Sequence, residues 1–239
     1  ATAPVVQYLI TYQERIIGAG DARTQAEVIA DGGTWPADSN RNRVIFSETL
    51  DDVTWPPNNF IDCDTGTGEV VSGLGVNSIN SATKGAQTQL VVFKPHSTFI
   101  NDGVLASADQ KLNIVSNVHG CPGYHSIVNT PFGLVFTSAY TVCMLDTTGK
   151  EPSQVGFLIH PAILEIPEDR AKWSAAIFHD NTYKLSITPT GQTTNQNEWW
   201  LDLRPQIFPN EQNWYGPHTG DRIFQYQVFQ GLLIGAQDT

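Results

Sequence analysis

The chain has 239 residues, of which 40% are hydrophobic and 15% are charged, and its formal net charge at pH 7 is −11. An acidic balance of this size argues against a protein that coats DNA or RNA through a basic stripe, and against a surface that seeks anionic lipid. The aromatic content of 10% and the recurring apolar runs exclude a disordered chain.

The predicted elements are mostly short strands, because apolar residues alternate with polar ones in many short stretches rich in Val, Ile, Phe, Tyr and Thr. Turn clusters of Gly, Pro, Asn, Asp and Thr separate them. We expect strands at 8–12, 15–19, 43–47, 69–74, 89–93, 111–116, 126–129, 134–138, 141–145, 156–160, 174–179, 183–188, 198–203, 223–228 and 231–235. About fifteen short strands at roughly even spacing predict an all-β protein.

Helix signals are sparse, so we expect almost no helix. The stretch 167–172 is compatible with a single helical turn. Residues 22–42 and 189–197 are polar and poor in strand-forming residues. They are interpreted as long surface loops. The sequence leaves open whether the first loop docks a partner protein or makes no such contact.

The two ends of the chain resemble each other. Ile17-Gly18-Ala19 matches 234–236, and Asp21 matches Asp238. The same strand–turn–strand pattern returns at 128–138 and 175–187. A hairpin with two apolar faces cannot bury itself, whereas several sheets arranged radially bury one another.

This repetition favours a β-propeller over a sandwich or a closed barrel. Because a blade of four strands takes ~40–45 residues, we expect about five blades, or a partial or larger ring. Residues 1–239 would form a single propeller domain, and the absent initiator methionine points to a processed chain or a segment of a larger protein. The last hairpin would either begin a further blade or complete the first one and lock the ring.

Three cysteines, Cys63, Cys121 and Cys143, cannot all pair within the chain. Oxidising compartments favour dense, even-numbered cysteine frameworks, so we expect a reduced or redox-indifferent protein. No apolar stretch approaches the ~18 residues of a membrane span, and the first residues lack the basic head and apolar stretch of a signal peptide. We expect no membrane anchor.

The stretch 47–55, with Ser47, Asp51, Asp52, Thr54 and Trp55, partly resembles the Asp box of sialidase-type propellers. Its glycine is missing and its spacing is imperfect. An Asp box is a structural turn, in which a carboxylate accepts hydrogen bonds from backbone N–H groups. The stretch therefore predicts a stabilised turn and no activity.

Two further motifs contain metal-ligand residue types. Asp62, Asp64 and the glycines after them resemble part of a calcium loop, but a twelve-residue loop with a closing Glu is absent. His119, Cys121 and His125 lie within seven residues, but a fourth zinc ligand is not evident. The first motif is interpreted as an acidic turn, with a bound ion left open, and the second as a tight loop with a small buried cysteine.

No catalytic motif is visible: the chain has no GxSxG elbow, no HExxH and no phosphate-binding glycine loop. The carboxylates Asp146, Glu165, Asp180 and Asp202 could be paired for glycoside cleavage, but their spacing selects no pair. No arginine triad is visible among Arg43, Arg170, Arg204 and Arg222. We therefore assign no catalytic, cofactor-binding or metal-binding residue and expect a protein that is not an enzyme.

Four aromatic residues could stack on sugar rings or pack between blades: Trp199, Trp200, Trp214 and Tyr215. Neighbouring residues of a strand point to opposite faces, so Trp199 and Trp200 are expected on opposite sides of their sheet. Burial between blades is the commoner use of tryptophan in a propeller.

Several segments resemble the propeller domains of bacteriophage tail structural proteins, including the nozzle proteins of short-tailed phages. They are LVVFKPHSTFI at 90–100, Cys121, SIVNTPFGLVFTS at 126–138, VCML at 142–145, FS at 46–47 with DVTWP at 52–56, VSGL at 71–74, and WWLDLR at 199–204 with WYGPH at 214–218. The likeness covers 42–146 and 173–238, and its motifs consist of blade packing and turns. Ala139-Tyr140 departs from it, because such blades often carry a glycine turn there.

The resemblance implies a structural, non-enzymatic component of a phage tail. It implies a homo-oligomeric ring, located in the virion beside other tail proteins, around the channel through which the genome leaves. DNA would pass nearby without specific binding, and no cofactor would be needed. An acidic wall around such a channel would repel phosphate.

Two other functions compete with this one, because propellers serve many purposes. A carbohydrate-binding or glycoside-cleaving, sialidase-like propeller would need convergent carboxylates, arginines and exposed aromatic side chains at one end of the ring. A cellular propeller that only binds other proteins would need no such cluster of carboxylates, arginines and aromatic side chains. The resemblance alone favours the tail protein.

Overall fold

The computed structural model describes residues 4–33, 41–63, 66, 68–81, 85–101, 105, 111–208, 211–220 and 222–237. It is mostly β, with 46% of residues in strands and 11% in helices. The strands form four four-stranded sheets and one two-stranded sheet, and every described pairing is antiparallel. The all-β prediction is confirmed, and no closed barrel is present in this part of the chain.

Each sheet is built from consecutive strands, and the sheets are numbered here in chain order. Sheet 1 contains β1 (Val6–Tyr12), β2 (Arg15–Asp21), β3 (Arg43–Phe46) and β4 (Phe60–Asp62). Sheet 2 contains β5 (Gly73–Ser81), β6 (Gly85–Phe93), β7 (Thr98–Asn101) and β8 (Asn113–Ser116). Sheet 3 contains β9 (Val128–Thr130), β10 (Gly133–Thr137), β11 (Val142–Asp146) and β12 (Ser153–Gln154). Sheet 4 contains β13 (Ala175–His179), β14 (Thr182–Ile187), β15 (Asn197–Asp202) and β16 (Trp214–Thr219). The terminal hairpin contains β17 (Ile223–Phe229) and β18 (Leu232–Gln237).

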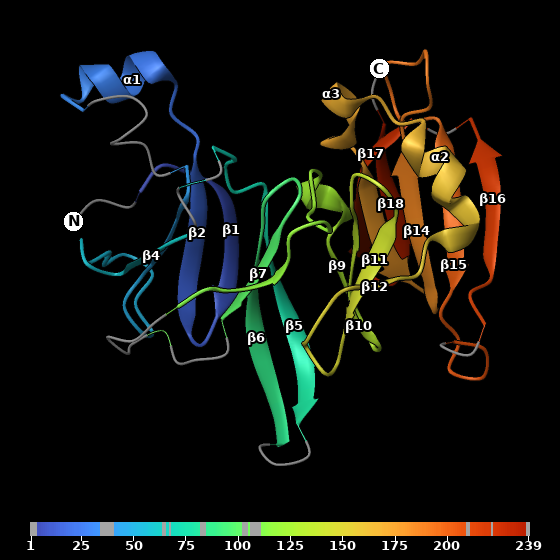
Figure 1. Ribbon diagram of the computed structural model, residues 1–239, viewed down its shortest axis with the longest axis horizontal. Helices are drawn as coiled ribbons and strands as arrows, with labels where there is room; N and C mark the ends of the chain where they lie inside the picture. The colour runs from blue at the N-terminus through green and yellow to red at the C-terminus, as the bar shows by residue number, and fades with distance from the viewer. Residues whose placement is uncertain are drawn as a thin grey trace.

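The sheets follow one another along the longest axis of the molecule, with sheet 1 at one end and sheet 4 with the terminal hairpin at the other (Figure 1). Neighbouring sheets touch through their first strands: β1 packs on β5, β5 on β9, β9 on β13, and β13 on β17. The first strands therefore make an unbroken series of contacts from one end of the molecule to the other.

Tight turns of one kind join the first two strands in three of these sheets. Both central residues have positive φ at 13–14, 180–181 and 230–231, as a type I′ hairpin turn requires. Counted from the turn, Ile17-Gly18-Ala19 and 234–236 occupy the same positions, because Tyr12 pairs with Arg15 and Phe229 with Leu232. The predicted match of the two hairpins is confirmed in register, although Asp238 lies outside the described residues.

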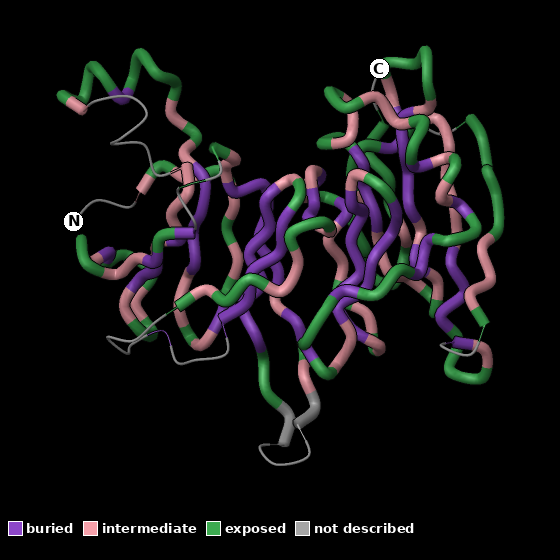
Figure 2. Tube along the Cα trace, viewed as in Figure 1, coloured by how far each residue is buried: buried purple, intermediate pink, exposed green. Residues whose placement is uncertain are grey.

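The hydrophobic core lies between the sheets. Leu90 and Val92 on β6 pack with sheet 1, whereas Val91 and Phe93 on the same strand pack with sheet 3. Strand β10 is also buried on both faces: Leu134 packs with sheet 2, and Val135 packs with sheet 4. The central strands therefore have two buried faces, and buried positions are concentrated in the middle of the molecule (Figure 2).

Hydrogen bonds from side chains also join the sheets. The Tyr183 hydroxyl of sheet 4 donates to the Ser126 carbonyl just before sheet 3 (3.2 Å), and Trp214 Nε1 donates to the carbonyl of Val155 (2.7 Å). Between sheets 2 and 3, the amide of Asn77 donates to a backbone carbonyl of β11 (2.9 Å). These bonds fix the register of one sheet against the next, in addition to the apolar packing.

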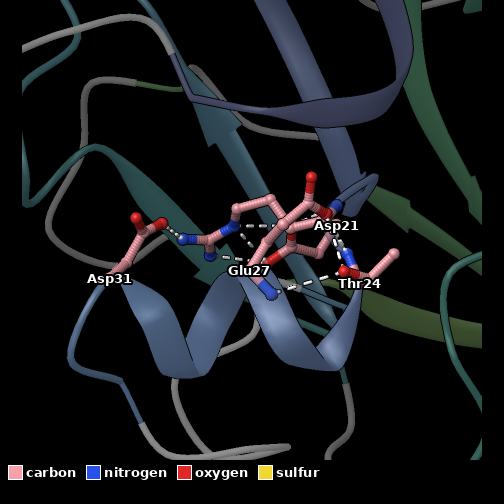
Figure 3. A network of polar contacts seen from close by, with 5 residues as sticks. Asp21, Thr24, Glu27 and Asp31 are labelled. Atoms are coloured by element: carbon pink, nitrogen blue, oxygen red, sulfur yellow. Dashed lines mark hydrogen bonds and ion pairs between the residues drawn. The ribbon is translucent and has the colours of Figure 1, made fainter.

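The expectation of almost no helix needs correction at two places. Helix α1 (Gln25–Ala30) lies within 22–42, which the sequence analysis interprets as a loop; positions 34–40 are outside the described residues. Its capping box joins the Thr24 and Glu27 side chains to each other's backbone N–H, and Arg23 binds the carboxylates of Asp21 and Asp31 (Figure 3). Helix α3 (Glu168–Ala171) is the expected single turn.

The second correction concerns 156–160, which is not a strand. A 3₁₀ turn (Phe157–Ile159) runs into helix α2 (His160–Leu164), in which Pro161 occupies the first turn. Proline suits that position because its missing N–H would have no helical partner there. The predicted strand 69–74 is also misplaced, since β5 begins only at Gly73.

Candidate functional site

The Asp-box-like stretch forms a capped turn between β3 and β4. Asp51 Oδ1 accepts hydrogen bonds from the backbone N–H groups of Val53 (2.9 Å) and Thr54 (3.0 Å). Hydrogen bonds from Thr54 and Val53 lower the pKa of the Asp51 carboxyl. Trp55 is buried, and its Nε1 donates to the Asp52 carbonyl (3.1 Å). The carboxylate stabilises the turn, as the sequence predicts.

The acidic turn after β4 is used differently from a calcium loop. Arg43 Nε lies 2.8 Å from Asp62 Oδ1, on the neighbouring strand at the paired position. The guanidinium also covers the Phe60 ring, 3.8 Å from its centroid. Asp62 therefore has an ion-pair partner, and Asp64 lies outside the described residues.

The loop with His119, Cys121 and His125 is a packing element. Burial raises the pKa of the Cys121 thiol to about 12, and the sulfur contacts the Gly123 carbonyl (3.2 Å). Burial also lowers the pKa values of His119 and His125, although His125 lies at the surface. Among the described residues no group of three or more His, Cys, Asp or Glu side chains could hold a metal ion.

The scattered carboxylates are mostly separated. Asp146 caps the turn after β11 through the Thr148 N–H (2.8 Å), and Glu165 follows helix α2. Asp180 and Asp202 are the two that one site brings together. The Arg204 guanidinium donates to both oxygens of Asp202, from Nε to Oδ1 (3.0 Å) and from Nη2 to Oδ2 (2.5 Å), and these hydrogen bonds lower the pKa of the Asp202 carboxyl.

Asp180 and Asp202 line a groove on one face of sheet 4, with a volume of about 300 Å³. Its other lining residues are Thr182, Trp200, Arg204 and Tyr215. Trp199 and Trp214 pack on the opposite face, in the core with sheet 3, so the expected division of the two neighbouring tryptophans is confirmed.

This groove lies on the face of sheet 4 that the terminal hairpin contacts. Glu198, on that face of β15, hydrogen-bonds both Trp200 Nε1 and the Tyr226 hydroxyl of β17. His179 Nε2 also lies 3.2 Å from the Gly231 carbonyl in the hairpin turn. The terminal hairpin covers one part of this face of sheet 4, and the groove lies on the part that the hairpin leaves uncovered. Chemically, the groove offers aromatic rings, a carboxylate and a fixed ion pair.

Two cavities lie where the sheets converge. The larger, of about 620 Å³, is lined by residues from β1, the turns after β6 and β10, and the segment 163–174. The smaller, of about 380 Å³, lies between the first strands of sheets 1 to 3 and includes Ile10, Leu74 and Ile127. Neither was predicted, because their lining residues are brought together only by the packing of the sheets.

No family model matches the chain, and no curated protein matches it. The described residues define an all-β protein of serially packed antiparallel sheets, with capped turns and with pockets between and beside the sheets. No helix in the described part of the chain is long and apolar enough to cross a membrane.

Proposed function

We propose that the chain is a non-enzymatic structural module of a phage tail, a β-propeller of about five blades that contributes to a ring around the genome-exit channel. The observation that supports the propeller is the order of contacts between the first strands, β1 to β5 to β9 to β13 to β17. Sheets that touch through their first strands stand around a common axis, as propeller blades do. The role in a phage tail rests on the resemblance of 42–146 and 173–238 to tail-protein propellers.

The composition of these first strands supports a passive channel wall. The sequences of β1, β5, β9, β13 and β17 contain no Asp, Glu, Lys or Arg. A polyanion that slides past such a surface forms no ion pairs and releases no counterions. The wall would be neutral rather than acidic, so the negative charge of the chain lies on other surfaces.

The terminal hairpin supports assembly into a ring. Phe229, Leu232 and Ile234 lie on one face of it and are 57%, 68% and 50% exposed. Tyr12 and Ile17 hold the positions of Phe229 and Ile234 in sheet 1, and both are buried there against sheet 2. The hairpin thus exposes the face that, in sheet 1, the following sheet covers.

The occupant of this face would be the first sheet of a second copy. Sheet 1 exposes Leu9, which is 54% exposed, on the side turned away from sheet 2. A head-to-tail contact between the hairpin of one copy and sheet 1 of the next joins two different surfaces. Such heterologous contacts generate rings when the rotation closes.

Size measurement of the purified chain tests this contact. We expect concentration-dependent association, and we expect the double variant Phe229→Lys/Leu232→Lys to sediment as a monomer. The matched control is Phe157→Lys/Leu158→Lys, since these residues are 74% and 63% exposed elsewhere on the molecule. A monomeric wild-type chain, or equal association of both double variants, would contradict the proposed ring contact.

A further inference from the structure

A pocket of about 250 Å³ lies at the junction of sheet 4 and the terminal hairpin. Three segments form it: the end of helix α3, the connection between β14 and β15, and the start of β17. Its lining residues are Arg170, Trp173, Thr188, Thr193, Thr194, Asn195, Arg222 and Phe224. None of the sequence motifs includes this set, because its members are spread over more than fifty positions of the chain.

Asn195 holds the three segments together. It is 3% exposed, and its Nδ2 donates to the carbonyls of Trp173 and Ile223, both at 2.8 Å. Its Oδ1 accepts a hydrogen bond from the Thr188 hydroxyl (2.7 Å). Three hydrogen bonds from one buried side chain fix the walls of the pocket before any ligand arrives, which lowers the entropic cost of binding.

The charge of the lining is opposite to that of the chain. Arg170 and Arg222 line the pocket, and none of the described lining residues is acidic, in a chain of net charge −11. Arg170 Nη1 donates to the Thr193 carbonyl (3.1 Å), and its Nε lies 3.2 Å from the exposed Asp169 carboxylate, so the side chain is held in place. A guanidinium matches the two oxygens of a carboxylate or phosphate.

The remaining lining suits a ring. Trp173 and Phe224 are 48% and 37% exposed, and such aromatic faces stack on flat or sugar rings. The Thr193 and Thr194 side chains add polar groups at the same rim. The volume admits one small molecule and is below the usual range of about 300–1,000 Å³ for drug-sized ligands.

We propose that this pocket binds a small ring compound that carries a carboxylate or a phosphate. The guanidinium groups of Arg170 and Arg222 hold the oxyanion, and the ring lies against Trp173 and Phe224. The shared chemistry is an oxyanion on a ring, which a sugar acid and a nucleoside monophosphate both provide. This site is separate from the proposed ring contact, so either can fail alone.

Isothermal titration of the full chain tests the site with four probes: glucuronate, thymidine 5′-monophosphate, and their uncharged counterparts glucose and thymidine. We expect at least one anion to bind about tenfold more tightly than its uncharged counterpart, with weaker binding at higher salt. Binding of glucuronate alone identifies a sugar-acid site, and binding of the nucleotide alone identifies a phosphate site.

Variants assign the binding to this pocket. Arg170→Gln and Arg222→Gln should each weaken anion binding about tenfold, as expected when one charged hydrogen-bond donor is lost. Arg204→Gln is the matched control, because Arg204 lines the separate groove on sheet 4 and should leave the affinity unchanged. Absence of binding by both anions, equal binding of the uncharged probes, or unchanged affinity in both pocket variants would overturn the proposal.

Discussion

Replacing Tyr183 by alanine is expected to lower the free energy of unfolding by about 3–5 kcal/mol, the range measured for large aromatic side chains removed from a core. Tyr183 is completely buried on β14, and its side chain contributes both to the core between sheets 3 and 4 and to a hydrogen bond with the Ser126 carbonyl. For a chain of this size the loss corresponds to a fall in melting temperature of roughly 6–20 °C. Thermal unfolding followed by circular dichroism measures it.

Two variants separate packing from the hydrogen bond. Tyr183→Phe keeps the ring and should lose only about 1 kcal/mol. Tyr140→Ala removes the same type of side chain from a position that is 44% exposed, and should cost about 0.5 kcal/mol or less. If Tyr183→Ala melts like Tyr140→Ala, sheets 3 and 4 do not pack as described.

Gly120→Ala should cost about 3 kcal/mol, at the upper end of the range for overpacked sites. A Cβ at this position would lie 2.1 Å from the Lys94 carbonyl oxygen, 2.4 Å from the Ser97 nitrogen and 2.6 Å from the His96 nitrogen. All three atoms belong to the backbone of the turn after β6, which cannot move aside as a side chain can. The Cys121 N–H that bonds the same carbonyl (2.9 Å) would be displaced.

Chemical denaturation of Gly120→Ala beside Gly18→Ala tests this close approach. A Cβ at Gly18 would meet the side chain of Val6 rather than backbone, with the two methyl carbons at 3.0 Å and the Val6 Cβ at 3.4 Å. We expect a loss of about 1 kcal/mol or less for the control. Equal stability of the two variants would mean that the segment before Cys121 does not lie against that turn.

The sequence allowed most of the strands to be predicted, because alternation of apolar and polar residues marks a strand that has two distinct faces. The strands β10, β11, β14 and β15 lie within one residue of their predicted ends, and each has a run of apolar residues that pack between sheets. Short or edge strands were missed. For example, β16 contains Gly216-Pro217, a pair that usually indicates a turn, and proline is tolerated only at a sheet edge.

Other misses have identifiable local causes. The apolar run before His160 fits a strand or a helix equally well, and Pro161 was the signal for the helix. Thr24 and Glu27 had the spacing of a capping box, which would have predicted α1 inside the presumed loop. β5 was misplaced because Asn77 and Ser78 give it a polar composition.

The sites were less predictable than the strands. The Asp51 turn could be predicted because its residues are close in the sequence and act on each other's backbone. The pocket of Arg170 and Arg222 could not, since it depends on the contact between β13 and β17 and on Asn195. Long-range pairs of this kind have no signature in a single sequence.

Electron cryomicroscopy of the assembly in which this chain occurs tests the central claim most directly. The account predicts several copies in a closed ring, with sheets that radiate from the particle axis and with β1, β5, β9, β13 and β17 nearest the channel. Sheets stacked in two flat layers, or copies placed away from any axial channel, would contradict it.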